Sequence, residues 1–193
     1  MGYDLPAAIG CAFARPGKRI ICIAGDGSIM MNLQELQTIV GHQLPIKIFI
    51  LNNRGYHSIR QTQNGFFPDN VVGCGGESGL SFPDYAKIAH AFGIPYDRCT
   101  CHDELNVRSQ STLATDGPAI CEVFLDLKQG FAPRASSRRL ASGEIVTAPM
   151  EDMAPFLSRE ELQENMIVPL VDDLGNDSRW QGSIAASLRL AGL

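Results

Sequence analysis

Short apolar runs alternate with amphipathic segments over the first two thirds of the chain. Continuous runs at 19–24, 46–51 and 119–125 predict strands that are buried on both faces. Apolar positions recur at helical spacing over 5–12, 33–40 and 82–92, and we expect a further helix over 103–115. Strands that alternate with helices form parallel sheets through crossover connections. We therefore predict an α/β fold of three layers, a parallel sheet with helices on both faces.

The pattern changes twice along the chain. The Gly-rich stretch 54–80 has few periodic positions and predicts an ordered loop without regular elements. After Gly130 the chain is irregular, with one short helix expected at 158–165 and capped by Ser158. We predict a domain over 1–130, a C-terminal arm over 131–175 that lies on it, and a disordered tail over 176–193.

Composition narrows the class of protein. Of the 193 residues, 45% are hydrophobic and 19% charged, which is typical of a globular chain. The 16 Lys and Arg against 21 Asp and Glu give a net charge of −5, so we expect no nucleic acid as a partner. Every apolar run is far shorter than the roughly 20 residues of a membrane span, so we expect no membrane either.

The six cysteines indicate a compartment. They form no CxxC pair, and Cys22 and Cys121 lie inside apolar runs. Buried, reduced thiols are typical of a cytoplasmic protein, which is the localisation that we predict.

Candidate chemistry follows the first strand, which ends in Gly25-Asp26-Gly27-Ser28. Free backbone N–H groups at the start of the next helix attract a phosphate, and the flanking glycines let it approach closely. The carboxylate of Asp26 would repel that phosphate unless a cation lies between them. Mg²⁺ binds in this way, through one or two protein oxygens and the phosphates of a ligand.

The second strand ends in Asn52-Asn53, with 24 residues between Gly27 and Asn52. Parallel strands bring their carboxyl ends to one edge of the sheet, where α/β folds bind ligands. Asp26, the amide oxygen of Asn53 and the carbonyl of Gly55 would then complete a magnesium site with phosphate oxygens and water. Alone, each motif has an ordinary interpretation as a turn or a strand cap, and their pairing is what points to a site.

This pairing resembles the diphosphate and Mg²⁺ motif of thiamine diphosphate enzymes. The text MGYDLPAAIG, GDGSIMMNLQELQT and PIKIFILNNRGY is similar to the C-terminal cofactor domain of the acetolactate synthase large-subunit group, from residue 1 to about 127. The resemblance implies thiamine diphosphate and Mg²⁺ as cofactors. It also implies chemistry on 2-oxo acids, with decarboxylation of pyruvate and carboligation to 2-acetolactate as the reference activity.

The resemblance also assigns residues to the site. The Mg²⁺ ligands would be Asp26, Asn53 and the carbonyl of Gly55. Residues near the cofactor itself would be Met1, Gly2, Gly25, Gly27, Ser28, His57 and Ser58. Met1 matches the apolar residue that supports the bent cofactor, and His57 and Ser58 match the loop beside the thiazolium ring. No catalytic residue is assigned, although His57 stays a candidate.

Part of the family's machinery has no match in the chain. The glutamate that activates the aminopyrimidine belongs to a pyrimidine-binding domain, and Glu35 cannot replace it because Glu35 lies on the helix after the first motif. We therefore expect a pyrimidine-binding domain or subunit as partner, a homo- or hetero-oligomer, and no turnover by the chain alone. Three interpretations stay open: a fragment or misplaced start, which we favour, one subunit of a split 2-oxo acid decarboxylase, or a non-catalytic cofactor-binding domain.

The substrate also stays open. Acetolactate synthases carry a Trp soon after the Asn pair, where this chain has Gln61-Thr62-Gln63. Decarboxylases of the pyruvate type often carry a Glu where this chain has Ile59.

Overall fold

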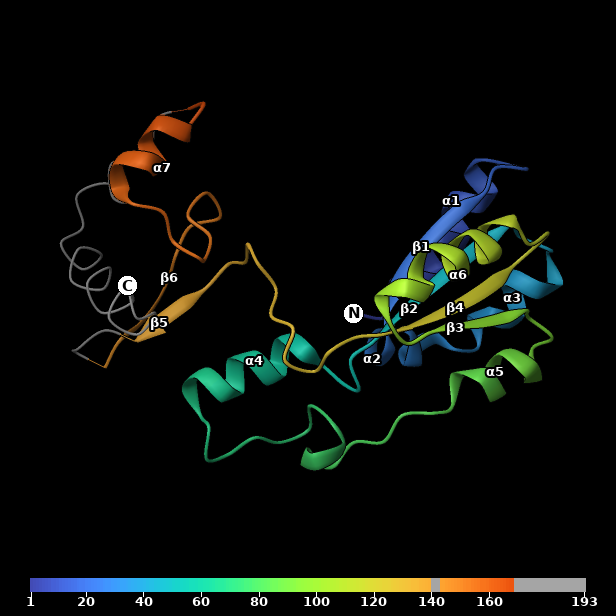
Figure 1. The fold of residues 1–193 in the computed structure, drawn as a ribbon, viewed down its shortest axis with the longest axis horizontal. Helices are drawn as coiled ribbons and strands as arrows, with labels where there is room; N and C mark the ends of the chain where they lie inside the picture. The colour runs from blue at the N-terminus through green and yellow to red at the C-terminus, as the bar shows by residue number, and fades with distance from the viewer. Residues whose placement is uncertain (140–142, 169–193) are drawn as a thin grey trace. The chain divides into compact units, whose positions relative to one another are not determined.

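Four parallel strands form the central sheet (Figure 1) of the computed structural model, which describes residues 1–139 and 143–168. The strands are β1 (Ile20–Gly25), β2 (Ile46–Asn52), β3 (Tyr96–Cys99) and β4 (Ala119–Phe124), in the spatial order β1-β2-β4-β3. The register pairs Ile20 with Ile46 and Lys47 with Ala119. The predicted parallel α/β class is confirmed.

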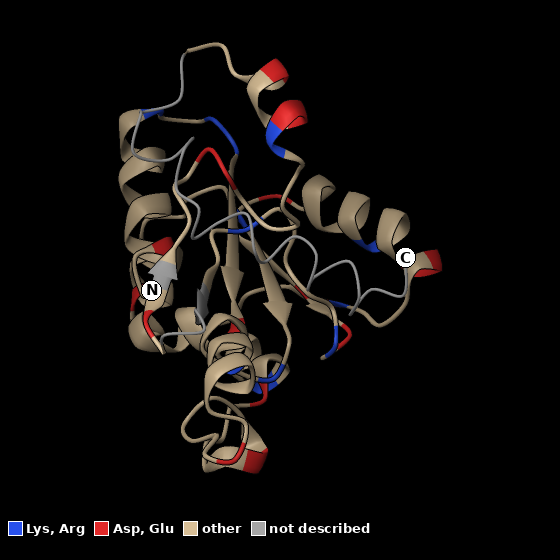
Figure 2. Ribbon diagram, turned by 90° about the vertical axis from the view of Figure 1, so that its left-hand side faces the viewer, with Lys and Arg blue, Asp and Glu red and all other residues tan. Residues whose placement is uncertain are grey.

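Helices connect the strands and follow them. They are α1 (Asp4–Ala14), α2 (Asp26–Ile29), α3 (Glu35–Gly41), α4 (His57–Phe66), α5 (Tyr85–Ala91), α6 (His102–Ala114) and α7 (Arg159–Asn165), with short 3-10 turns η1 (Met30–Asn32) and η2 (Gly76–Ser78). Among the described helices, none combines the length and apolar character needed to cross a membrane. In Figure 2 the Lys and Arg positions are spread among the Asp and Glu positions.

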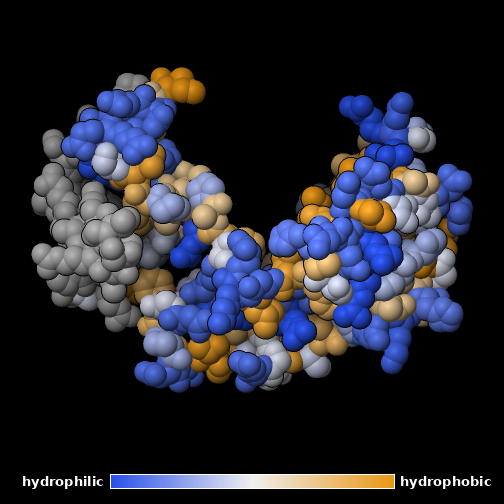
Figure 3. Space-filling model, in the orientation of Figure 1, coloured by the Kyte–Doolittle hydropathy of each residue, from blue (hydrophilic) through white to orange (hydrophobic). Residues whose placement is uncertain are grey.

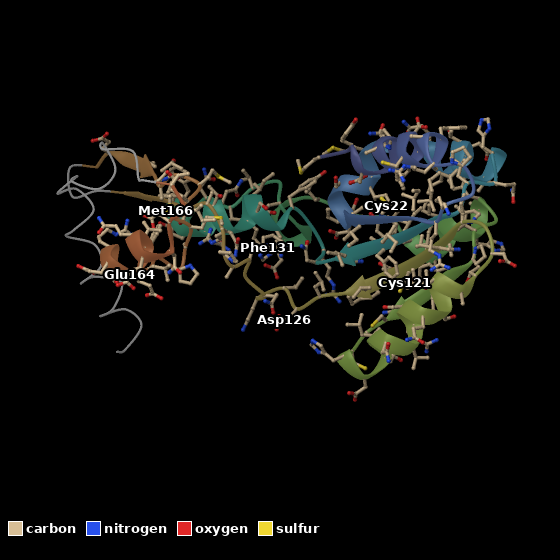
Figure 4. The ribbon with its side chains drawn as sticks, turned by 90° about the horizontal axis from the view of Figure 1, so that it is seen from above. Cys22, Cys121, Asp126, Phe131, Glu164 and Met166 are labelled. Atoms are coloured by element: carbon tan, nitrogen blue, oxygen red, sulfur yellow. The ribbon has the colours of Figure 1, made fainter. Side chains whose placement is uncertain are left out.

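The main core lies on one face of the sheet. Ile46, Ile48 and Ile50 alternate along β2 and are fully buried with Leu5 of α1 and Leu36 of α3. Helix α6 packs against β3 and β4 from the opposite face. Figure 4 shows Cys22 on the side of the sheet that carries α1, and Cys121 on the side that carries α6.

One strand is buried on one face only, which corrects the prediction for 19–24. In β1, Cys22 and Ala24 are buried, but Ile21 is 55% and Ile23 is 65% exposed. The reason is that β1 is an edge strand and α6 covers only the other half of that face. This face contributes to the apolar surface that Figure 3 shows on the unit 1–129.

Two further predictions were wrong. The strand β3 was missed because it is short, lies at the sheet edge and reads Tyr-Asp-Arg-Cys, which is not an apolar run. The stretch 54–80 is not a loop throughout, because it contains α4 and η2. Helix α4 buries only His57. Its sequence has too few apolar positions at helical spacing to predict a helix.

The chain divides into two compact units, Met1–Gln129 and Gly130–Leu193. In the described part of the second, β5 (Ser137–Arg139) pairs with β6 (Ile145–Thr147) in an antiparallel hairpin. Ser158 caps α7 as expected, since its side chain accepts from the amide of Glu161. Arg159 pairs with the buried carboxylate of Asp152 at 2.8 Å. The expected tail, 176–193, lies outside the described residues.

Candidate functional site

The end of β1 places a buried carboxylate at the carboxyl edge of the sheet. Gly25 is still extended, and α2 begins at Asp26, whose side chain has no exposed surface. Its Oδ2 accepts a 2.9 Å hydrogen bond from the amide of Gly55. Burial raises the pKa of Asp26, and hydrogen bonds from backbone amides, that of Gly55 first, oppose the rise. The charged form is therefore solvated by backbone amides rather than by water.

Two oxygen-bearing groups, the Asn53 side chain and the Gly55 carbonyl, lie beside Asp26. The side-chain amide of Asn53, a residue 8% exposed, donates through its nitrogen to the Gly55 carbonyl oxygen at 2.7 Å and to Oδ1 of Asp26 at 3.3 Å, in the orientation that satisfies both contacts. Neighbouring ligands of octahedral Mg²⁺ lie about 3 Å apart. If the amide turns over, its oxygen faces both of these oxygens instead, as ligation of a shared cation requires. Distances of 2.7 and 3.3 Å therefore suit hydrogen bonds when no cation is bound and ligation when one is bound. These groups fit a hard divalent cation.

The ligand types also matter. In the described part of the chain, no three or more His, Cys, Asp or Glu side chains gather as a metal site. A cation here would depend on one carboxylate and on neutral amide and carbonyl oxygens, the oxygen donors that Mg²⁺ and Ca²⁺ accept.

Two glycines allow close approaches at this edge. A Cβ on Gly27 would lie 2.5 Å from the ring of Tyr56, so the aromatic ring lies directly over the backbone of the first turn. Gly55 has φ +149°, and a Cβ there would lie 2.1 Å from the carbonyl oxygen of Cys74. A side chain at Gly27 would displace the Tyr56 ring, and one at Gly55 would push against the backbone of Cys74.

The first residues of the chain lie beside the same turn. The backbone amide of Gly2, at φ +76°, donates to Oγ of Ser28 at 2.8 Å, and the side-chain nitrogen Nδ2 of Asn32 donates to the Gly2 carbonyl. Met1 itself is 75% exposed. The structure therefore brings Gly2 and Ser28 together beside the motif at Gly25–Gly27.

The remaining predicted residues begin α4. His57 is 7% exposed, whereas Ser58 is exposed and its carbonyl accepts from Oγ1 of Thr62 at 3.0 Å. Both lie within three residues of Gly55, on the segment that follows residues 53–55. We call residues 53–55 the cation loop.

Sequence reasoning missed several groups that hold this loop. The Arg60 guanidinium donates to the carbonyls of Asn53, Arg54 and Cys74 at 3.0–3.4 Å. The Tyr85 hydroxyl donates to the backbone carbonyl of Asp26 at 2.5 Å. No local sequence signal marks either residue, because each contact depends on where α4 and α5 pack.

A cavity of about 810 Å³ adjoins the loop. Residues at the end of β2, in α4 and in the segment 71–83 line it, including Arg54, Arg60 and Asn64 on its polar side and Leu80 and Phe82 on its apolar side. The arrangement can therefore admit a small polar molecule next to the candidate cation site.

The comparisons with known proteins agree on one domain. A family model described as "Thiamine pyrophosphate enzyme, C-terminal TPP binding domain" matches residues 1–123. The chain is 41% identical over 127 residues to acetolactate synthase isozyme 2 large subunit of Escherichia coli (strain K12), covering 65% of this chain and 22% of that protein. It is 44% identical over 126 residues to the acetolactate synthase large subunit of Pyropia yezoensis, covering 65% and 20%.

A plant relative shows a similar partial match. Chloroplastic acetolactate synthase 2 of Nicotiana tabacum is 38% identical over 141 residues, covering 71% of this chain and 21% of that protein. The chain thus matches about a fifth of the length of these curated relatives.

Proposed function

Because the chain belongs to the thiamine pyrophosphate enzymes through their C-terminal TPP-binding domain, we propose that its carboxyl edge binds Mg²⁺ together with the diphosphate of the cofactor. The observation that carries the proposal is the convergence of the Asn53 side-chain amide, the Gly55 carbonyl and the Asp26 carboxylate within 2.7–3.3 Å. With the oxygen of the Asn53 amide turned toward the other two groups, they can ligate a cation together, and a bound diphosphate needs that cation as well.

Different residues of the chain would hold the metal, the diphosphate and the rest of the cofactor. Asp26, Asn53 and the Gly55 carbonyl would hold the metal. The first turn of α2, with Gly27 and Ser28, would contact the diphosphate, and Met1, Gly2, Gly25, His57 and Ser58 would lie along the rest of the cofactor. When bound, thiamine diphosphate supplies the stabilised carbanion that cleaves and forms bonds next to a carbonyl carbon, while the protein binds, orients and excludes water.

For the whole enzyme we propose a transferase or lyase of the acetolactate synthase type, acting on 2-oxo acids such as pyruvate. Identity of 41% and 44% to two acetolactate synthase large subunits, over 127 and 126 residues, supports it. The chain would work with a pyrimidine-binding domain or subunit, within a homo- or hetero-oligomer. The competing proposal, a non-catalytic cofactor-binding domain, predicts cofactor binding without turnover even when that partner is supplied.

The experiment is a calorimetric titration of the chain with thiamine diphosphate, with and without Mg²⁺. Asp26→Ala removes the one carboxylate among the proposed ligands and should weaken Mg²⁺-dependent binding by about 2–4 kcal/mol. Asp69→Ala, at an exposed aspartate, is the matched control and should leave binding unchanged. Equal affinities of Asp26→Ala and wild type would overturn the proposal.

A further inference from the structure

The first asparagine of the pair has no role in the site proposed above, although the structure gives it specific partners. Asn52 is the last residue of β2. Its amide nitrogen donates to Oε1 of Glu122 at 2.5 Å, and its oxygen accepts from the amide of Arg54 at 2.9 Å. One side chain therefore links a carboxylate in β4 to the turn between Asn53 and Gly55.

Glu122 is a carboxylate inside the fold. It is 4% exposed, and its second oxygen accepts from the hydroxyl of Tyr96 in β3. A buried carboxylate is costly unless its oxygens are hydrogen-bonded. Both oxygens of Glu122 accept hydrogen bonds, one from Asn52 and one from Tyr96. Glu122 therefore links β4 to its two neighbours, β2 and β3.

Glu122 decides which way the amide of Asn52 faces. An ionised carboxylate only accepts hydrogen bonds, so the nitrogen of the amide must face Glu122. The amide oxygen is then left to face the amide of Arg54. A neutral partner at position 122 could present either a donor or an acceptor and would not fix this choice.

The turn that receives this contact is strained. Arg54 has φ +56°, a conformation that residues other than glycine seldom adopt. A side-chain oxygen that bonds to the amide two residues later stabilises such turns. The conformation of Arg54 matters because it sets the direction of the chain between Asn53, whose side-chain amide lies 2.7 Å from the Gly55 carbonyl oxygen, and Gly55 itself.

We propose that Glu122 is a positioning residue for the cation loop and acts through Asn52. The proposal rests on the proposed function for the cation itself. Glu122 touches neither metal nor cofactor in this scheme; it holds the amide of Asn52, which holds Arg54 in the conformation that lets Asn53 and Gly55 ligate together.

The test compares three variants of the full chain. Glu122→Gln releases the amide orientation, Asn52→Ala removes the link, and Tyr96→Phe removes the other donor to Glu122 without touching Asn52. Calorimetry with thiamine diphosphate at rising Mg²⁺ gives the Mg²⁺ concentration at half-saturation. We expect it to rise about fivefold in Glu122→Gln and about tenfold in Asn52→Ala, with binding restored at high Mg²⁺, and to change less than twofold in Tyr96→Phe.

A second measurement needs no ligand. Hydrogen exchange of the Arg54 amide, measured in the folded chain, should quicken about tenfold in Glu122→Gln and Asn52→Ala and stay as in wild type in Tyr96→Phe. Unchanged exchange in the first two variants would overturn the proposal, and so would an equal shift of the Mg²⁺ midpoint in all three, which a merely structural role predicts. If Asp26→Ala binds like wild type, the cation proposal fails instead.

Discussion

The hydroxyl of Tyr85 donates a hydrogen bond to the backbone carbonyl of Asp26, 59 residues earlier in the chain. Tyr85 is 2% exposed and Asp26 is fully buried. Helix α5 therefore anchors the residue at which α2 begins, on the carboxyl edge of the sheet. An element that carries no proposed ligand thus helps to set the geometry of the site.

Tyr85→Phe should destabilise the chain by about 1–3 kcal/mol, because the buried carbonyl of Asp26 loses its donor. The measurement is the free energy of unfolding from urea denaturation. Tyr3→Phe is the control, since Tyr3 is 75% exposed and its hydroxyl can bond to water; its change should stay within about 0.5 kcal/mol. Equal effects of the two substitutions would contradict the anchoring role.

Gly27→Ala should destabilise the chain by about 1–3 kcal/mol, because the new methyl group would overlap the ring of Tyr56. Gly10→Ala is the matched control. Gly10 lies in α1 with open space where a Cβ would be, so alanine should stabilise the helix by about 0.5–1 kcal/mol. The two changes should have opposite signs in urea denaturation.

A double-mutant cycle identifies the cause of the Gly27 effect. If the ring of Tyr56 is responsible, Gly27→Ala should cost less in a Tyr56→Ala background than in wild type. The same cost in both backgrounds would mean that the backbone of the first turn, not the ring, excludes a side chain.

The sequence predicted those parts of the fold that bury an apolar run. Strands β1, β2 and β4 have such runs, and each lies where it was expected. The exposed face of β1 could not be foreseen, because Ile21 and Ile23 are as apolar as buried strand residues. Strand β3 and helix α4 bury few apolar side chains, so the pattern carried no sign of them.

In the site, too, the sequence predicted some residues and not others. The spacing of the two motifs correctly placed Asp26 and Asn53 at one sheet edge, since parallel strands align their carboxyl ends. The partners that hold these residues lie far away in sequence: Glu122 is 70 residues from Asn52, and Tyr85 is 59 from Asp26. Those contacts depend on strand order and register, which a local motif does not contain.

The buried thiols should resist alkylation. Burial, with a smaller effect from the charge of Asp4, raises the pKa of Cys22 to about 11, and burial also raises the pKa of Cys121. Treatment of the native chain with N-ethylmaleimide at pH 8 should label the exposed Cys11 and Cys101 and spare these two, as read by peptide mass spectrometry. Labelling of all the cysteines at one rate would contradict the packing of the sheet.

Cys22 should also make stability depend on alkaline pH. Its thiol ionises near 9.0 when unfolded and at about 11 when folded, so the unfolded chain loses its proton first. The contribution of Cys22 to stability is present below pH 9 and is lost as the pH rises to about 11. In urea denaturation between pH 8 and 11, Cys22→Ala should show a shallower fall than wild type, and parallel curves would contradict the assignment.

The chain alone should not consume pyruvate. The resemblance implies that a carboxylate outside this domain activates the aminopyrimidine, and two acids of this chain already have hydrogen-bond partners inside the fold. Glu122 bonds to Asn52 and Tyr96 inside the sheet, and Glu35 accepts from Oγ1 of Thr38 along α3. A coupled assay with saturating thiamine diphosphate and Mg²⁺ should therefore show no turnover by the purified 193-residue chain.

Supplying a pyrimidine-binding domain in trans should restore turnover if the acetolactate synthase-like proposal holds. Asp26→Ala in the reconstituted enzyme is the control, and it should abolish the restored activity because the proposed metal loses its carboxylate ligand. Cofactor binding without turnover in the reconstituted mixture would favour the non-catalytic alternative. Steady turnover by the lone chain, lost in Asp26→Ala, would instead show that an acid within these 193 residues performs the activation.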